Sequence, residues 1–346
     1  MEKRLSKRKE EILKYIITCF AQNPEPVGSK RLQEVAGLGV SSATIRNEMS
    51  ELERLGYIAH PHTSAGRVPT DKGYRYYVDH LVAARNLQTE KIMRMVYDLK
   101  REMYNMDEFF KAISEIIAIF AQQVGVIVFP ALDDLSLRYV NIIPIGNKRH
   151  LIVWATMSGL IHEQVICFDD DISPETIQRI ANFINTEFIG MPFHAVENFL
   201  KNKRKEMHDS VTVLLDFAEK IVHGYAAMRQ RKKVWVEGRN RFFDEPEFQS
   251  IVKVKPIFDA LDDQAQVAHI FDNNTPNTVL QVTIGHENAY EHFWNCSIIR
   301  RSFEINPSLY GTISVLGPRR MDYEQIFSVV NNIAAGMSNM MQENNQ

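Results

Sequence analysis

Residues 62–70, HTSAGRVPT, combine a glycine, a proline, three hydroxyls and one arginine with almost no apolar bulk. Three kinds of site fit these residue types: a phosphate-binding catalytic loop, a metal site begun by His60 and His62, or a loop that grips a larger polyanion. A Walker-type loop requires the spacing GxxxxGK[ST], and this segment has neither the spacing nor the lysine. No nearby Cys, His or carboxylate cluster completes a tetrahedral set around the two histidines, so no metal is expected.

The polyanion interpretation assigns the segment to a DNA-binding wing. The side chains of Thr63, Ser64 and Arg67 can contact phosphates. Gly66 permits a tight turn, and Pro69 limits pairing of the strand edge with another strand. Such a loop binds by position and carries out no chemistry.

A second set of residues has helical spacing. Ala43, Arg46, Asn47 and Ser50 lie opposite the apolar residues Ile45, Met49 and Leu52. Arg can pair with guanine, Asn with adenine, and an Ala methyl can touch a thymine methyl, although a solvated polar face is the alternative. The acids of this helix come late in it, which suits an N-terminal half directed at DNA. Its first turn adds Ser41, Ser42 and Thr44 to the candidate DNA-binding residues.

The preceding helix has a similar anomaly in its first turn. Lys30 and Arg31 stand where the helix dipole disfavours cations, yet free backbone N–H groups and two cations would suit a backbone phosphate. Ser29 is expected to cap this helix and to join the phosphate contacts. The alternative is charge that only increases solubility.

The elements that must position these residues are three helices and a hairpin. Apolar spacing predicts a first helix over about 12–20, which ends at NPEPVGS; KRLQEVA is a short second helix, and GLG at 37–39 turns into a third helix starting at Ser41 or Ser42. Two short stretches, LGYIAHP and RVPTDKGYRYYV, are expected to form the hairpin. Residues 1–82 therefore predict a winged helix-turn-helix domain.

The rest of the chain predicts a mixed α and β architecture. Helices are expected over 81–123, with Asp107 capping the last, then a buried strand near 124–130, a three-stranded meander over 137–168, and helices from Ser173 to about 230. A helix near 246–263, strands near 266–271, 278–284, 294–304 and 311–317, and a closing helix over 322–341 follow. The predicted class is α+β multidomain: an α/β domain of 83–133 and 233–346, interrupted by an inserted module of 134–232.

Composition sets the broad class of this 346-residue chain. Apolar residues make up 45% and charged residues 24%, which is ordinary for a globular protein. The apolar runs are far shorter than the roughly 20 residues of a membrane helix, and the N-terminus has no signal-peptide core, so a cytoplasmic protein with no membrane contact is expected. The three cysteines are expected to be ordinary buried thiols. Net charge is −3, but residues 1–80 carry 13 basic against 10 acidic residues, so a polyanion would bind at that end.

Four segments together resemble a known family. PEPVGSKRL, GLGVSSATIRNEMSELERLGYI, HPHTSAGRVPTDKGYRYYV and GTISVLGPRRMDY are similar, in order and spacing, to the bacterial heat-inducible transcription repressor HrcA. Ser42 stands where the family often has proline. The resemblance implies a winged-helix domain, a GAF-like domain and an inserted dimerisation domain. It also implies binding to an inverted-repeat operator on double-stranded DNA ahead of chaperone operons, and the GroEL chaperonin as a partner needed for repression that heat removes.

The expected function is therefore a homodimeric repressor without a cofactor. One winged helix reads only a few base pairs, so specificity calls for two copies on an inverted repeat. Two alternatives stay open. The GAF-like domain could hold a small metabolite, which an apolar pocket with convergent polar groups would favour. An enzyme with an accessory DNA-binding domain would require a cluster of titratable residues in 83–346, where no such cluster is recognisable in the sequence.

Overall fold

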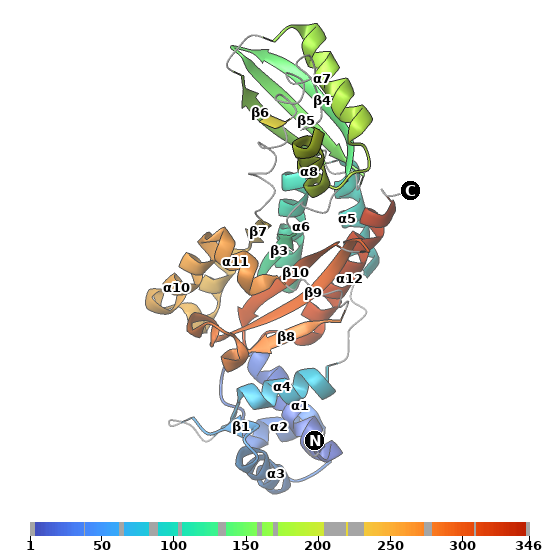
Figure 1. Cartoon of the computed structure of the whole chain (residues 1–346). Helices are drawn as coiled ribbons and strands as arrows, with labels where there is room; N and C mark the ends of the chain where they lie inside the picture. The colour runs from blue at the N-terminus through green and yellow to red at the C-terminus, as the bar shows by residue number, and fades with distance from the viewer. Residues whose placement is uncertain are drawn as a thin grey trace.

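The structure, a computed structural model, describes residues 4–37, 39–61, 66–82, 89–102, 106–130, 136–157, 161–168, 172–203, 219–220, 232–272, 279–307 and 309–343. It is mixed α and β, as expected. The first four helices lie at one end of an elongated molecule, a five-stranded sheet lies in the middle, and a three-stranded sheet lies at the other end (Figure 1).

In the N-terminal unit, residues 4–82, the described residues form four helices and two very short strands: α1 (Lys7–Gln22), α2 (Ser29–Ala36), α3 (Ser42–Arg54), β1 (Ile58–Ala59), β2 (Val68–Pro69) and α4 (Asp71–His80). Its core contains the apolar faces of α1 and α3, including Ile12, Ile16, Ile45, Met49 and Leu52, all at most 5% exposed. The inward face predicted for α3 is therefore confirmed. Gly37 and Gly39, both with positive φ, make the turn between α2 and α3.

The predicted second strand of the hairpin is wrong over most of its length. Only Val68 and Pro69 pair with β1, and the residues from Asp71 onward form α4. The Thr70 hydroxyl caps this helix by accepting a hydrogen bond from the Gly73 backbone N–H at 3.1 Å. A capping threonine followed by an acid signals a helix start, which the run of tyrosines obscured.

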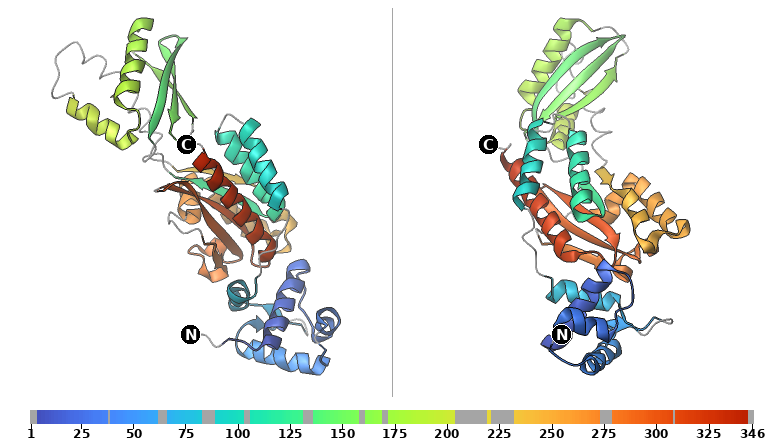
Figure 2. Two further views of the ribbon diagram at one scale, coloured as in Figure 1. Left: turned by 90° about the vertical axis from the view of Figure 1, so that its right-hand side faces the viewer. Right: turned by 180° about the vertical axis from the view of Figure 1, so that it is seen from behind.

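The body of the molecule is an antiparallel sheet in the order β7 (Lys233–Glu237), β3 (Val124–Phe129), β10 (Leu309–Pro318), β9 (Cys296–Asn306) and β8 (Gln281–Ile284). On one side lie α5 (Thr89–Glu102), α6 (Met106–Ala121) and α12 (Tyr323–Glu343); on the other lie α10 (Ile251–Asp262) and α11 (Gln264–Phe271) (Figure 2). Because both faces are covered, every residue of β3 is buried: Val124, Val126 and Val128 pack with α10 and α11, whereas Ile127 and Phe129 join the opposite core.

Three local predictions for the body were wrong. Residues 266–271 lie in the helix α11 and not in a strand. A short apolar run fits a helix as well as a strand. The helix is favoured here because the Asp263 side chain caps it, accepting hydrogen bonds from the N–H groups of Ala265 and Gln266. The helix predicted near 246–263 is divided into a 3₁₀ turn at Pro246–Phe248 and α10. Asp107 lies inside the first turn of α6, where it contacts Lys233.

The predicted meander is confirmed as a separate three-stranded sheet. It runs β4 (Leu137–Gly146), β5 (Arg149–Thr156) and β6 (Ile161–Cys167), followed by α7 (Pro174–Glu187), capped by Ser173 with Pro174 in its first turn as predicted, and α8 (Phe193–Lys203). Asn147 and Lys148, both with positive φ, form the two-residue turn between β4 and β5. We call residues 136–203 the three-stranded module.

The two faces of this sheet differ sharply. The inner face, which includes Val140, Ile152 and Trp154, packs with the apolar side of α7. The outer face is exposed and largely apolar: Tyr139 of β4 pairs with Ala155 of β5, which in turn pairs with Ile161 of β6. In the same way Ile143 pairs with Leu151, which pairs with Val165. Cys167 ends β6 and is exposed, which corrects the expectation for that thiol; Cys19 and Cys296 are buried.

Candidate nucleic-acid interface

The first turns of α2 and α3 meet in space. Ser29 is the first residue of α2 and Ser42 the first of α3, and their hydroxyl oxygens lie 3.0 Å apart in a hydrogen bond. Ser29 was predicted to cap α2, but the N-cap is Gly28, so the Ser29 hydroxyl serves this contact instead. The N-terminal ends of two helices, each with free backbone N–H groups and positive dipole character, are thereby held side by side.

The N-terminus of α3 is fixed by its own hydroxyls. Of the two predicted starts, Ser42 is the first residue of α3 and Ser41 is its N-cap. The Ser41 side-chain oxygen accepts a hydrogen bond from the Thr44 N–H at 3.2 Å. The Thr44 hydroxyl lies 3.0 Å from the same oxygen. These two side chains therefore stabilise the helix start, and Ser41 remains exposed.

The predicted outward face of α3 is brought together and exposed. Ala43, Arg46, Asn47 and Ser50 are all accessible, while the intervening Ile45 and Met49 are buried. The Ser50 hydroxyl donates to the Arg46 carbonyl oxygen at 3.0 Å, so it is occupied within its own helix. The first two turns of α3 thus present an arginine and an asparagine to solvent on one surface.

Every acid of α3 is neutralised by a cation of the N-terminal unit. Lys9 contacts Glu48 at 3.4 Å and Glu51 at 2.9 Å, and Arg67 contacts Glu53 at 2.9 Å. The hydrogen bond between Lys9 and Glu51 raises the pKa of the lysine and lowers that of the carboxyl. The acids of α3 are therefore all paired with cations, and they lie in the later part of the helix, beyond its first turn.

Three unpaired cations lie at the other end of the helix pair. Within the described part of the chain, Lys30, Arg31 and Arg46 form no ion pair, in contrast to Arg8, Lys9, Arg54 and Arg67. Lys30 and Arg46 are exposed, and Arg31 is half-buried. Three cations that are free to meet an anion thus lie near the place where the two helix N-termini converge.

Arg67 is positioned differently from the prediction that it holds a phosphate. Its Nε and Nη2 atoms both contact Glu53 at 2.9 Å, and its side chain is only 18% exposed. Its backbone pairs in both directions with Val27, which precedes α2. Sequence reasoning missed this pairing because Glu53 and Val27 become neighbours of Arg67 only through the tertiary fold.

Gly66 is needed for close approach, because a Cβ atom there would lie 2.5 Å from the Pro26 backbone carbonyl. This contact fixes the base of the predicted wing against the loop before α2. The tip lies outside the described residues, and with it His62, Thr63 and Ser64. His60 is exposed, and its ring nitrogen contacts the neighbouring Pro61 carbonyl oxygen.

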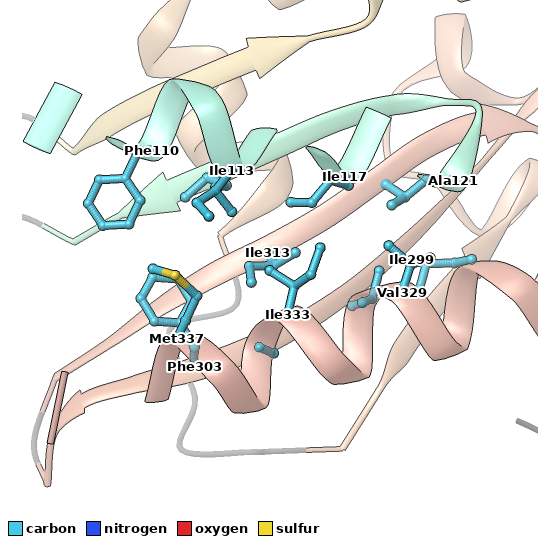
Figure 3. Close-up of a cluster of buried hydrophobic side chains, with 14 of the residues drawn as sticks. Phe110, Ile113, Ile117, Ala121, Ile299, Phe303, Ile313, Val329, Ile333 and Met337 are labelled. Atoms are coloured by element: carbon cyan, nitrogen blue, oxygen red, sulfur yellow. The ribbon is translucent and has the colours of Figure 1, made fainter. Parts of the chain in front are cut away.

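The space between the sheet and α6 and α12 is filled by side chains (Figure 3). Phe110, Ile113 and Ile117 of α6 face Phe303 and Ile313 of the sheet, all buried. Ile333 and Met337 of α12 complete this layer. By the criterion set from the sequence, this filling does not favour a metabolite site in the interior of the body.

Neither a metal site nor a membrane span is found in the described chain. No three His, Cys, Asp or Glu side chains in the described ranges gather to hold a metal ion, and Asp169, Asp170 and Asp171 lie outside those ranges. None of the described helices is long and apolar enough to cross a membrane.

Comparison with known proteins supplies the family. The family model for the HrcA protein C-terminal domain matches residues 107–327. The heat-inducible transcription repressor HrcA of Bacillus pumilus is 27% identical over 345 residues, covering 97% of this chain and 98% of that protein. That of Symbiobacterium thermophilum is 30% identical over 338 residues, covering 96% and 98%.

A solved structure supports the fold. The crystal structure of a hypothetical protein at 2.2 Å resolution superposes with a TM-score of 0.66 at 21% identity, covering 99% of this chain and 100% of that one. Because the family model covers most of the chain and the relatives cover nearly all of it, the predicted resemblance is confirmed, and so is the expectation of a regulator and not an enzyme. The chain belongs to the HrcA family of heat-inducible transcription repressors.

Proposed function

We propose that this repressor binds an inverted-repeat operator on double-stranded DNA as a homodimer, with residues 1–82 acting as a winged helix. The observation that supports it most is the convergence of the α2 and α3 N-termini through Ser29 and Ser42, next to three unpaired cations. Two dipole ends and free cations at one place suit a phosphate backbone, and a helix with Arg and Asn exposed in its first two turns suits a major groove.

In this proposal the side chains divide into two groups. Ala43, Arg46 and Asn47 read base edges, and Lys30 and Arg31 hold phosphates. The hydroxyls at the starts of α2 and α3 fix the helix ends and stand next to the DNA backbone in this proposal: Ser29, Ser41, Ser42 and Thr44. Ser50 stands further along the same exposed face of α3 and is proposed to lie next to the DNA as well. Thr63 and Ser64 remain proposed phosphate contacts of the wing. Because Arg67 is paired with Glu53, we assign it to holding the wing in place.

Dimerisation is assigned to the inserted segment, residues 134–232. Its support is the outer face of the three-stranded sheet, where Tyr139, Ile161 and Val165 are 52%, 46% and 52% exposed. A sheet face of this kind is normally covered, and a second copy of the same face is the simplest cover in a homodimer. Residues 83–133 and 233–346 form the GAF-like domain in this division.

The wider regulatory role follows from the family resemblance. We propose repression ahead of chaperone operons in the cytoplasm, with the GroEL chaperonin needed for activity and repression lost when heat draws the chaperonin away. The exposed apolar side chains of Ile251 and Val252, 76% and 78% accessible at the start of α10, support a surface for a protein partner. DNA footprinting on the promoter of the protein's own chaperone operon, with and without chaperonin, tests this part.

The base-reading role is tested by Arg46→Ala. A bidentate arginine–guanine contact contributes about 1–3 kcal/mol of discrimination, so operator affinity should fall by roughly tenfold or more while affinity for scrambled DNA changes little. Fluorescence anisotropy on both DNAs measures the difference. Arg54→Ala is the matched control, since Arg54 is an exposed arginine in the last turn of the same helix and lies away from the proposed contact. An equal loss on both DNAs would remove Arg46 from base recognition.

A further inference from the structure

The N-terminal unit is seated directly on the body through α1 and α4. Tyr74 and Tyr77 of α4 and Tyr323 of α12 are each at most 3% exposed, and the Tyr323 ring centroid lies 6.2 Å from that of Tyr74 and 6.3 Å from that of Tyr77. We call this contact the seat. The apolar core continues across it, since residues from both sides belong to one buried cluster.

Asp71, in the first turn of α4, is the polar centre of the seat. Its carboxylate accepts hydrogen bonds from Arg319 Nη1 at 2.5 Å, from the His286 ring nitrogen at 2.7 Å and from the His286 backbone N–H at 3.2 Å. Gly285 makes room for it, because a Cβ atom there would lie 2.2 Å from an Asp71 oxygen. The body therefore has a shaped recess for this one side chain.

Arg320 holds the other helix. Its Nη1 donates to the Ala21 carbonyl oxygen at 2.9 Å, in the last turn of α1, while Glu245 and Glu247 pair with the rest of the guanidinium. The side chain is only 10% exposed. Two successive arginines in the turn before α12 thus hold two different helices of the N-terminal unit: Arg319 holds α4 and Arg320 holds α1.

A third contact restrains rotation of the unit on the body. Arg75 of α4 donates to the Val282 carbonyl oxygen at 2.7 Å and pairs with Glu287, both on or next to the edge strand β8. Lys14 of α1 pairs with Glu324 of α12 at 3.2 Å. These contacts lie on two different helices and at two successive turns of α4, so together they restrain orientation as well as position.

We propose that the seat determines which half-site spacing the dimer recognises. This inference rests on the proposed operator-binding dimer. Two recognition helices on a rigid two-fold body reach only half-sites at one separation, whereas helices on flexible tethers reach many. Arg319 and Arg320 are then specificity-determining residues that act from outside the DNA interface, through the orientation of α3.

The experiment uses the full-length chain and a series of operators whose two half-sites are moved apart by one base pair at a time over half a helical turn. Wild-type affinity should peak at one spacing and fall by roughly 100-fold or more where simultaneous contact is lost. In the combined Arg319→Ala and Arg320→Ala variant the peak should broaden, and the ratio between best and worst spacing should drop at least about tenfold. Arg179→Ala combined with Lys253→Ala removes two exposed charges elsewhere and should keep the wild-type profile.

Affinity for a single half-site shows whether the N-terminal unit is still folded. It should be unchanged in the double variant and in the milder Asp71→Asn variant, which keeps the size of the side chain. A spacing profile identical to wild type in both variants would overturn the role of the seat, and so would loss of half-site binding in both. If wild type itself did not distinguish the operator from scrambled DNA, the proposed function would fail instead, and the two failures are therefore separable.

Discussion

At the scale of single residues, the division between paired and unpaired cations carries most of the functional information. Arginines that look equivalent in the sequence differ in the fold: Arg46 is exposed and unpaired within the described chain, whereas Arg67 is held by Glu53. The position of Arg46 followed from helical spacing alone. The pairing of Arg67 could not be predicted, because its partner is 14 residues away on another element.

The role assigned to Arg67 predicts that removing either partner of its ion pair with Glu53 has the same effect on DNA binding. If Arg67 positions the wing through Glu53, then Glu53→Gln should weaken DNA binding in the same direction as Arg67→Ala, although it makes the protein less acidic. A partly buried ion pair broken from either side commonly costs about 1–3 kcal/mol. Binding isotherms over a range of salt concentrations give the readout.

The salt dependence distinguishes the two roles of Arg67. A phosphate contact would lower the slope of log affinity against log salt by about one when Arg67 is removed. A positioning role leaves that slope nearly unchanged. Glu34→Gln, which alters an exposed acid of α2, provides the charge-matched control for Glu53→Gln.

At the scale of elements, the three-stranded module offers a prediction about assembly. Tyr139 and Val165 lie on its exposed outer face, on the two edge strands. Replacing both with aspartate should convert the proposed dimer to monomer, because buried like charges would face each other across the two-fold axis. Light scattering after size exclusion measures the mass, and operator affinity should fall by about 10² to 10⁴ while half-site affinity is kept.

The control for this variant lies on the opposite side of the same module. Gln178 is exposed on α7, whose apolar side packs on the inner sheet face, so Gln178→Asp adds charge without touching the outer face. A Tyr139→Asp and Val165→Asp variant that kept the mass of a dimer would place the interface elsewhere.

The secondary-structure elements also show which parts of the fold the sequence predicts. The helix pair, the meander and the closing helix were predicted because their apolar periods and caps are local. The sequence did not predict that residues 71–80 and 264–271 are helices. Short apolar or aromatic runs fit the periodicity of a helix and that of a strand equally well, and a single capping residue favours the helix in each case. The exposed outer face of the three-stranded sheet could be located only once strand order and register were known.

At the scale of the whole molecule, the seat links the N-terminal unit to the pH of the solution. Burial alone would raise the pKa of Asp71, but hydrogen bonds from His286 and Arg319 lower it below its ordinary value. A carboxyl with a lowered native pKa adds stability above the unfolded value of about 3.9, and this contribution is lost as pH falls through the native pKa.

Asp71→Asn should therefore lower the melting temperature at pH 7, and the difference from wild type should shrink toward zero as the solution is acidified below about pH 4. Differential scanning calorimetry at several pH values measures it. Asp259→Asn, an exposed acid on α10, should show no such convergence. A constant difference at all pH values would mean that the charge of Asp71 is not what stabilises the seat.

The outer sheet face of the three-stranded module has a consequence for gene dosage. If only the dimer binds the operator tightly, and the dimer forms through this face, then at low protein levels the fraction of operator that is occupied rises with the square of the number of chains in the cell. Small changes in synthesis or turnover would then be amplified at the promoter. A repressor of this design would respond to its own abundance more steeply than one that reads its site as a single chain.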